Sequence, residues 1–133
     1  MITLEEAVKL VWKAFNDMEG GETYVKKIPS MRVTDIAQAI APDVEPKIIG
    51  IRPGEKLHEQ MISKDDSYFT YEYDDYFKIL PILNDWGSSK ERIKAGVKVE
   101  EGFSYTSNDN SEWMSIEMLK EWIENNKEKI GKI

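Results

Sequence analysis

The sequence predicts a mixed α/β fold: a small mixed sheet with helices packed on it, then a loop-rich C-terminal extension that ends in a helix. Three observations predict this fold. Apolar residues recur at helical spacing near both ends of the chain, short apolar and aromatic runs lie between breakers, and residues 81–112 are rich in Gly, Ser and Asn. The 133 residues suffice for one ordinary domain. We therefore expect a core over residues 1–80 and an extension over residues 81–133.

The first helix has the clearest start signal in the chain. Thr3 and Glu6 have the spacing of a capping box, and Gly20 and Gly21 end the helical pattern. Apolar residues then recur at spacings of four and three, at Leu4, Val8, Val11, Phe15 and Met18. This spacing predicts one apolar stripe along one face of the helix.

The next elements alternate between strand and helix. Residues 22–28 predict a strand, and a second, shorter helix begins at Thr34 and stops at Pro42. Two aromatic runs, residues 68–73 and 76–80, predict strands that Asp74 and Asp75 could join as a hairpin. Residues 81–112 predict loop with brief strands at most. Ser115 then caps a last helix, whose apolar residues are Ile116, Leu119, Trp122 and Ile123.

The octapeptide Arg52-Pro53-Gly54-Glu55-Lys56-Leu57-His58-Glu59 is the most informative stretch. The short apolar run at residues 47–51 before it predicts a buried strand, and the apolar residues Leu57, Met61 and Ile62, which begin within the octapeptide, predict a short helix. Pro and Gly at that junction favour a tight turn. Backbone N–H groups at the start of the helix, beside a guanidinium, would then bind a phosphate.

Arg52 and Glu55 suggest a more specific ligand. A guanidinium is the natural bidentate partner of a phosphate, whereas a carboxylate is repelled by one. Glu55 suits the site if it points away, towards the neutral hydroxyls of a ribose diol. The pair therefore suggests a site that binds the adjacent phosphate and sugar groups of one nucleotide. The alternative interpretation is a turn whose charged side chains are simply exposed to solvent.

Composition excludes several classes of partner and site. The net charge of −7, without a basic stripe, argues against a nucleic-acid partner. The chain has no cysteine, so a thiolate metal site is impossible and a reducing, cytoplasmic location is expected. No stretch has the length and apolarity of a membrane span, and the first residues, with Glu5 and Glu6, do not resemble a signal peptide.

Other candidate sites have a simpler structural interpretation. The sequence lacks Gly-x-Gly-x-x-Gly, Tyr-x-x-x-Lys and Walker A motifs, and His58 is its only histidine, which favours a structural role over that of a general base. The acidic pairs Asp65-Asp66 and Asp74-Asp75, and the segment Asn108-Asp109-Asn110, are typical of turns, not of calcium loops. The aromatic residues between Tyr68 and Phe77 favour a core over a surface that stacks uracil or sugar.

Several segments resemble one known family in the same order. They are Met1 to Val8, Lys27 to Arg32, Ile49 to Glu59, Phe103 to Asn108, and Asn110 to Ser115 with the helix after it. The family comprises the inverting UDP-N-acetylglucosamine 4,6-dehydratases and their capsular-polysaccharide relatives, which are extended short-chain dehydrogenases. The resemblance covers essentially the whole chain, and the run around Arg52 is its most specific part.

The resemblance implies a substrate-binding role without catalysis. Family members are more than twice as long, and their N-terminal Rossmann half holds NADP, the catalytic Tyr and Lys, and an Asp-Lys pair, none of which this chain contains. The full enzymes oxidise C4 of the sugar, eliminate the C6 hydroxyl and return the hydride to C6 with inversion at C5. By resemblance, Arg52 would contact the UDP diphosphate and Glu55 the uridine ribose. Lys56, Met31 and Arg32 would line the site.

Three hypotheses therefore remain open. The first is a UDP-sugar-binding, C-terminal region, with residues 1–80 as the substrate-binding core, that cannot catalyse alone and holds no cofactor itself. The second is a non-enzymatic interaction module that docks on a separate NADP-binding chain or associates with itself. The third is an independent enzyme that uses His58 with Glu55.

Overall fold

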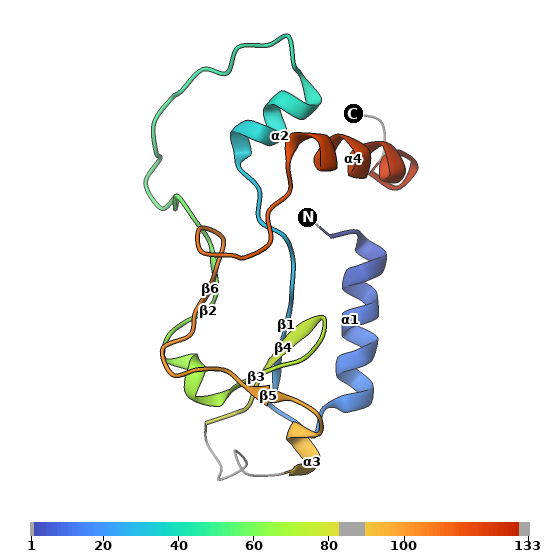
Figure 1. Cartoon of the computed structure of the whole chain (residues 1–133), viewed down its shortest axis with the longest axis vertical. Coiled ribbons are helices and arrows are strands. Elements are labelled where there is room, and N and C mark those ends of the chain that lie inside the picture. The colour runs from blue at the N-terminus through green and yellow to red at the C-terminus, as the bar shows by residue number, and fades with distance from the viewer. Residues whose placement is uncertain (1, 83–89, 131–133) are drawn as a thin grey trace. The chain divides into compact units, whose positions relative to one another are not determined.

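The computed structural model describes residues 2–82 and 90–130, and Figure 1 shows the arrangement of the elements. The order along the chain is α1 (Leu4–Asp17), β1 (Thr23–Lys26), α2 (Val33–Ile40), β2 (Gln60–Ile62), η1 (Asp66–Phe69, a 3-10 helix), β3 (Thr70–Glu72), β4 (Tyr76–Ile79), α3 (Lys90–Ile93), β5 (Val97–Lys98), β6 (Tyr105–Thr106) and α4 (Ile116–Ile130). The predicted mixed α/β fold is confirmed.

Contacts divide the chain into two units that interleave along the sequence. The sheet unit comprises residues 2–28 and 60–106, and the helix unit comprises residues 29–59 and the chain from Ser107 onward. The division expected at residue 80 concerns function and stays a prediction. Of the loop expected over residues 81–112 of the extension, residues 83–89 lie outside the described part.

The sheet unit is built on four antiparallel strands in the order β1-β4-β3-β5. The predicted hairpin is present: β3 and β4 pair, and the Tyr73 N–H donates to the Tyr76 carbonyl at 2.9 Å across Asp74 and Asp75. Strands β2 and β6 form a second antiparallel pair. The paired strands described are therefore antiparallel, whereas a mixed sheet was expected. The core cluster comprises Val25, Ile62, Phe77 and Val99.

Helix α1 begins where the capping box predicts. The Glu6 N–H donates to the Thr3 hydroxyl at 3.2 Å, and the Thr3 N–H donates to the Glu6 carboxylate at 2.7 Å. The predicted apolar stripe also lies on one face, but that face is exposed. Its members, joined by Trp12, are Leu4, Val8, Val11, Phe15 and Met18.

A buried ionic network, which sequence analysis did not predict, joins α1 to the sheet and to α3. Lys78 is 0% exposed, and its Nζ lies 2.5 Å from the Asp17 carboxylate and 2.6 Å from the Arg92 carbonyl oxygen. The Arg92 guanidinium lies 2.5 Å from Glu22. Burying a charge is costly unless it is paired, and each charge here has an opposite partner within the sheet unit.

The helix unit confirms the second and last helices and corrects two other predictions. Helix α2 contacts α4, and the Met118 N–H donates to the predicted cap, the Ser115 hydroxyl, at 3.2 Å. Residues 47–51 form no strand, and the residues after Gly54 form no helix; Met61 and Ile62 belong to β2 instead. Three prolines, Pro42, Pro46 and Pro53, interrupt this stretch, which disfavours regular structure.

Candidate functional site

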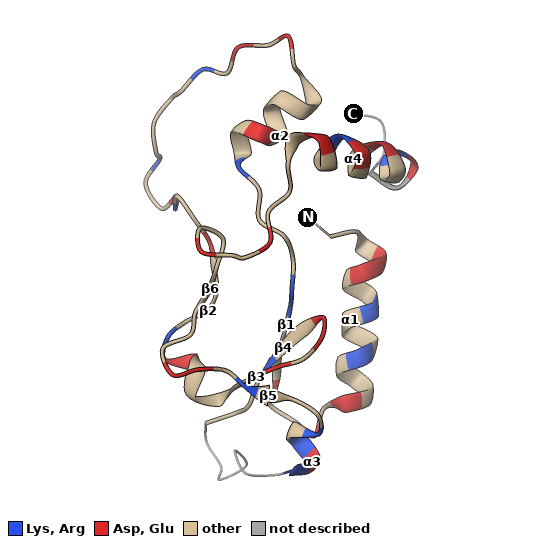
Figure 2. Cartoon of the chain, in the orientation of Figure 1, with Lys and Arg blue, Asp and Glu red and all other residues tan. Residues whose placement is uncertain are grey.

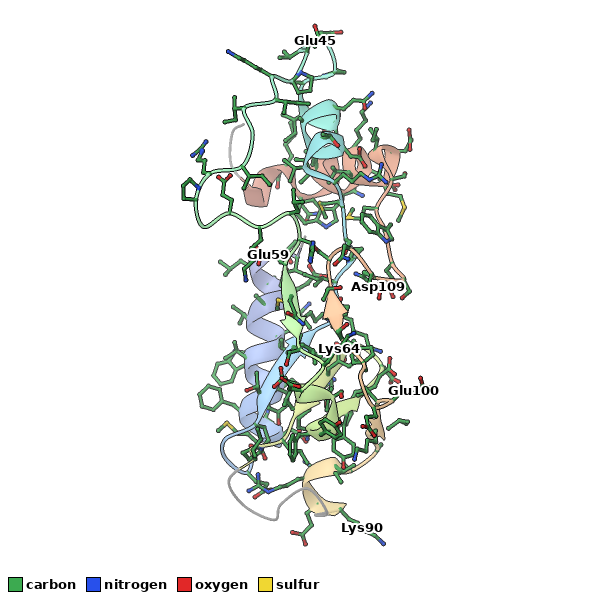
Figure 3. The ribbon with its side chains drawn as sticks, turned by 90° about the vertical axis from the view of Figure 1, so that its left-hand side faces the viewer. Glu45, Glu59, Lys64, Lys90, Glu100 and Asp109 are labelled. Carbon is green, nitrogen blue, oxygen red and sulfur yellow. The ribbon has the colours of Figure 1, made fainter. Side chains whose placement is uncertain are left out.

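A long exposed loop connects α2 to β2 and carries the predicted nucleotide site. Every residue from Pro42 to Glu59 is exposed, including Ile48, which is 94% exposed. Figure 3 labels Glu45 and Glu59 near the two ends of this loop. Charges of both signs occur along the loop, as the red and blue positions in Figure 2 show. The acidic residues are Asp43, Glu45, Glu55 and Glu59, and the basic residues are Lys47, Arg52 and Lys56. The loop therefore offers cations that alternate with carboxylates.

Arg52 to Glu55 form a tight turn. The Glu55 N–H donates to the Arg52 carbonyl at 3.0 Å, as in a β-turn, and Gly54 has a φ of 87°. Proline in the second position and a glycine with positive φ in the third are typical of a type II turn. The predicted turn at this junction is therefore confirmed.

The side chains of Arg52 and Glu55 face each other across the turn. Arg52 Nε lies 3.5 Å from Glu55 Oε1, and the Arg52 N–H donates to Glu55 Oε2 at 2.8 Å. The Arg52 side chain is nevertheless 71% exposed. The turn therefore presents a guanidinium that is oriented by its own carboxylate and remains accessible to an anion.

This geometry corrects one part of the sequence argument. No helix follows the turn, so no helix N-terminus adds amide donors or a dipole to the site. The Glu55 carboxylate contacts Arg52, and its expected contact with a ribose stays a prediction. The role of Arg52 as an anion partner does not depend on a helix, and it also stays a prediction.

The other predicted residues lie in the helix unit without a described bond to the turn. Lys56 is exposed, Met31 is half-buried, and Arg32 is the exposed residue that precedes α2. His58 is exposed, and both Glu55 oxygens are close to Arg52, so nothing described pairs His58 with Glu55. Among the predicted residues, the described contacts join Arg52 to Glu55, and the binding roles of all five stay predictions.

Segments that are far apart in sequence meet at Ser30 and Glu59. The Ser30 N–H donates to the Glu112 carbonyl at 2.8 Å, and the Met114 N–H donates to the Ser30 carbonyl at 2.9 Å. The Ser107 N–H donates to the Glu59 carbonyl at 2.8 Å. The extension therefore folds back onto its own chain at both ends of the segment that carries the candidate site residues.

An open pocket of about 400 Å³ lies at the start of the loop, apart from the predicted site residues. Its lining residues are Thr34, Gln38, Pro42, Asp43, Val44, Glu45 and Pro46. Two carboxylates and no cation line it, so it would repel a diphosphate. This pocket is unsuited to the predicted ligand.

The remaining candidates behave as structural elements. Tyr71, Tyr76 and Phe77 are buried, which supports the interpretation of the aromatic run as core, while Tyr68 is exposed. Over residues 2–82 and 90–130, no group of three His, Cys, Asp or Glu side chains could hold a metal ion. In the same residues no helix combines the length and apolarity needed to cross a bilayer.

Comparison with known proteins identifies relatives of the chain. The sequence model described as "Polysaccharide biosynthesis protein" matches residues 1–81. The inverting UDP-N-acetylglucosamine 4,6-dehydratase of Campylobacter jejuni is 49% identical over 92% of this chain. The UDP-glucose 4-epimerase of Rickettsia canadensis is 29% identical, also over 92% of this chain.

The X-ray structure of Pen from Bacillus thuringiensis has a similar fold. Its TM-score is 0.77 at 26% identity, over 96% of this chain and 37% of that chain. The chain likewise covers 38% of the Campylobacter relative and 37% of the Rickettsia relative. It therefore spans less than two-fifths of the length of these relatives, and their activities are not transferred to it directly.

Proposed function

The chain belongs to the polysaccharide biosynthesis protein family, and on that premise we propose that it is the UDP-sugar-binding part of an enzyme similar to the inverting UDP-N-acetylglucosamine 4,6-dehydratases. The similarity to the Campylobacter jejuni enzyme over 92% of this chain supports the choice of ligand class. The observation that carries the proposal is the Arg52–Glu55 turn, which presents an oriented, exposed guanidinium.

Arg52 would bind the diphosphate of the ligand. Guanidinium–phosphate hydrogen bonds are charge-assisted, and each contributes about 1.5–3 kcal/mol. Because Glu55 accepts a hydrogen bond from the backbone N–H of Arg52, the backbone of the turn is already ordered and loses less freedom on binding. Glu55 would reach the uridine ribose only if a ligand draws it from Arg52. Lys56, Arg32 and Met31 would then complete the contacts around the nucleotide.

The chain alone would bind a UDP-sugar but would not catalyse its conversion. Hydride transfer in the resembled enzymes uses NADP, and the glycine motif that binds a dinucleotide does not occur in this sequence. The proposal assigns NADP and the catalytic Tyr and Lys to another part of the working enzyme. A cytoplasmic location belongs to the same proposal, because a chain without cysteine suits a reducing compartment.

Calorimetric titration with UDP tests the role of Arg52. We expect weak but measurable binding by the natural chain and a loss of about 10-fold or more in Arg52→Ala, the equivalent of one charge-assisted contact. Lys47→Ala is the matched control, because it removes an exposed cation from the same loop but outside the turn. Equal affinities of all three proteins would refute the assignment.

A second candidate function is that of a non-enzymatic interaction module, and the exposed apolar face of α1 favours it. The partner would be a separate NADP-binding chain or a second copy of this chain. Sedimentation velocity with and without such a partner separates this function from simple ligand binding. A chain that stays monomeric in every mixture would exclude it.

A further inference from the structure

The Arg52–Glu55 turn already contains an anion beside the group that would bind a phosphate. Glu55 Oε1 lies 3.5 Å from Arg52 Nε, and Glu55 Oε2 accepts a hydrogen bond from the Arg52 N–H at 2.8 Å. The backbone N–H therefore holds the carboxylate next to the guanidinium of the same residue. Both contacts are made within one β-turn, so they follow from local geometry and not from the packing of distant elements.

This arrangement distinguishes Arg52 from the other cations of the loop. Within residues 42–59, all of which the structure describes, Lys47 and Lys56 have no carboxylate at ion-pair distance, whereas Arg52 has one. A loop that only attracted anions would not need a carboxylate beside its guanidinium, because like charges repel the ligand. The Glu55 carboxylate must therefore be considered together with any anion that Arg52 binds.

Glu55 makes Arg52 a weaker partner for a simple phosphate. A guanidinium presents its N–H donors in a planar fork, and Glu55 lies at the Nε edge of that fork. A phosphate at this edge displaces Glu55, and a phosphate at the other edge lies close to a group of the same charge. The two side chains are 71% and 50% exposed, and such a pair shifts an equilibrium by no more than about fivefold. The pair thus weakens phosphate binding without preventing it.

A nucleotide offers Glu55 a new partner, which a simple phosphate does not. The proposed ligand carries a ribose diol close to its diphosphate, and neighbouring hydroxyls can donate charge-assisted hydrogen bonds to one carboxylate. Glu55 then exchanges its contact with Arg52 for contacts with the sugar. Phosphate or pyrophosphate leaves the displaced carboxylate with water alone. Discrimination between ligands commonly needs such an element that opposes the wrong one.

We propose that Glu55 is a specificity-determining residue, which lowers the affinity of Arg52 for phosphates without a ribose and is released from Arg52 to the ribose of a nucleoside diphosphate. The inference rests on the proposed UDP-sugar function. It adds to that function a reason why the exposed guanidinium prefers a nucleotide to inorganic phosphate or pyrophosphate. In the nucleotide complex both members of the pair have new partners, so neither charge is left uncompensated.

Glu55→Gln tests this exchange. Glutamine keeps a side-chain oxygen that can accept the Arg52 N–H, so the turn is retained, but the negative charge is removed. Heteronuclear NMR titrations without divalent cations would measure dissociation constants for pyrophosphate, UDP and 2′-deoxy-UDP at the amides of Arg52, Gly54 and Glu55. The amides of α2 and α4 show in the same spectra whether the variant is folded. Glu59→Gln is the matched control, because it removes one negative charge from the same loop outside the turn.

The two ligand classes should respond to Glu55→Gln in opposite directions. We expect pyrophosphate to bind about twofold to fivefold more tightly, because its competitor for Arg52 is gone. UDP should bind more weakly, because charge-assisted hydrogen bonds to the ribose contribute more than an exposed ion pair. The ratio of the pyrophosphate and UDP dissociation constants should therefore fall at least about fivefold, and the preference for UDP over 2′-deoxy-UDP should shrink. In Glu59→Gln both affinities should change by the same factor.

Tighter binding of both UDP and pyrophosphate by Glu55→Gln, or an unchanged affinity for pyrophosphate, would overturn the inference. The proposed UDP site would still stand in that case, provided that the natural chain binds UDP and Arg52→Ala does not. A natural chain that binds no UDP would refute the proposed function and this inference together. The two failures are therefore distinguishable.

Discussion

Lys78 in the sheet unit and Arg52 in the helix unit are both cations paired with a carboxylate, yet their surroundings differ completely. Lys78 is fully buried and held by Asp17 and a backbone carbonyl, whereas the Arg52 side chain is 71% exposed beside Glu55. In the Lys78–Asp17 pair, the ammonium group donates hydrogen bonds to protein acceptors. In the Arg52–Glu55 pair, the guanidinium is accessible to solvent, as binding of an anionic ligand requires.

Burial therefore distinguishes a charge with a structural role from a charge that could bind a ligand, whereas the presence of a carboxylate partner does not. A buried pair adds little by itself because desolvation opposes the attraction, but loss of one partner leaves an uncompensated charge. An exposed pair contributes at most about 1 kcal/mol, so its loss scarcely affects the fold. Substitutions in the two regions should therefore affect different measurements.

The largest effect is expected for Lys78→Met. It leaves the Asp17 carboxylate without its buried partner, and the free energy of unfolding should fall by about 3 kcal/mol or more. Urea denaturation followed by circular dichroism measures the change. Lys94→Met is the matched control, since Lys94 pairs with the same carboxylate but is half exposed, and it should cost under about 1 kcal/mol. If Lys78→Met and Lys94→Met lower the free energy of unfolding equally, burial does not determine how much such a pair contributes to stability.

Acid should reproduce part of that loss. Burial raises the pKa of Asp17, but hydrogen bonds from Lys78, Lys94 and Tyr24 outweigh burial and lower the pKa to about 2. A lowered carboxyl pKa contributes stability that is present above the unfolded value near 3.8 and is lost as the pH falls through 2. We expect a loss of about 2 kcal/mol between pH 5 and pH 2. Asp17→Asn should reduce that pH dependence when unfolding is measured across the same range.

A smaller effect is expected for Gly54→Ala in the exposed turn. Its φ of 87° suits glycine, and an added Cβ meets no atom within 4 Å, so the cost is conformational and about 1 kcal/mol. The free energy of unfolding should fall by no more than about 1 kcal/mol, but UDP affinity should fall several-fold because the turn orients Arg52. Gly50→Ala has the same left-handed backbone outside the turn and serves as the control. If Gly54→Ala binds UDP as tightly as the natural chain, UDP binding does not depend on the conformation of the turn.

The smallest effect is expected for Phe15→Glu in the isolated chain. Because Phe15 is two-thirds exposed and lies on neither the core cluster nor the ionic network, its replacement should change the free energy of unfolding by about 0.5 kcal/mol or less. Thermal denaturation by circular dichroism checks this. A loss of several kcal/mol would mean that the apolar face of α1 already packs within the single chain.

The sequence predicted those elements whose signals are local. The Thr3–Glu6 capping box, the Ser115 cap and the turn at Asp74 and Asp75 are present because the residues that form them are neighbours. The Pro53–Gly54 turn was predicted for the same reason. Each depends on short-range geometry that a few side chains determine.

The elements that it missed depend on distant contacts. Residues 47–51 have the apolar content of a buried strand, but no described strand pairs with them, and a strand is defined by its partner. The Lys78–Asp17 pair is separated by 61 positions in sequence, and neither residue has a local pattern that indicates burial. The hydrogen bond from the Arg52 N–H to the Glu55 carboxylate was not predicted either, because it depends on the conformation of the turn.

The interleaving of the two units limits how this protein can be divided. The chain passes from one unit to the other after residues 28, 59 and 106, so no single peptide-bond cleavage separates them. A truncation at residue 80 would remove β5 and β6 from their antiparallel partners and the residues that bond to Ser30 and Glu59. Half-chains are therefore expected to be poor reagents, and point substitutions in the whole polypeptide are the sound way to assign its parts.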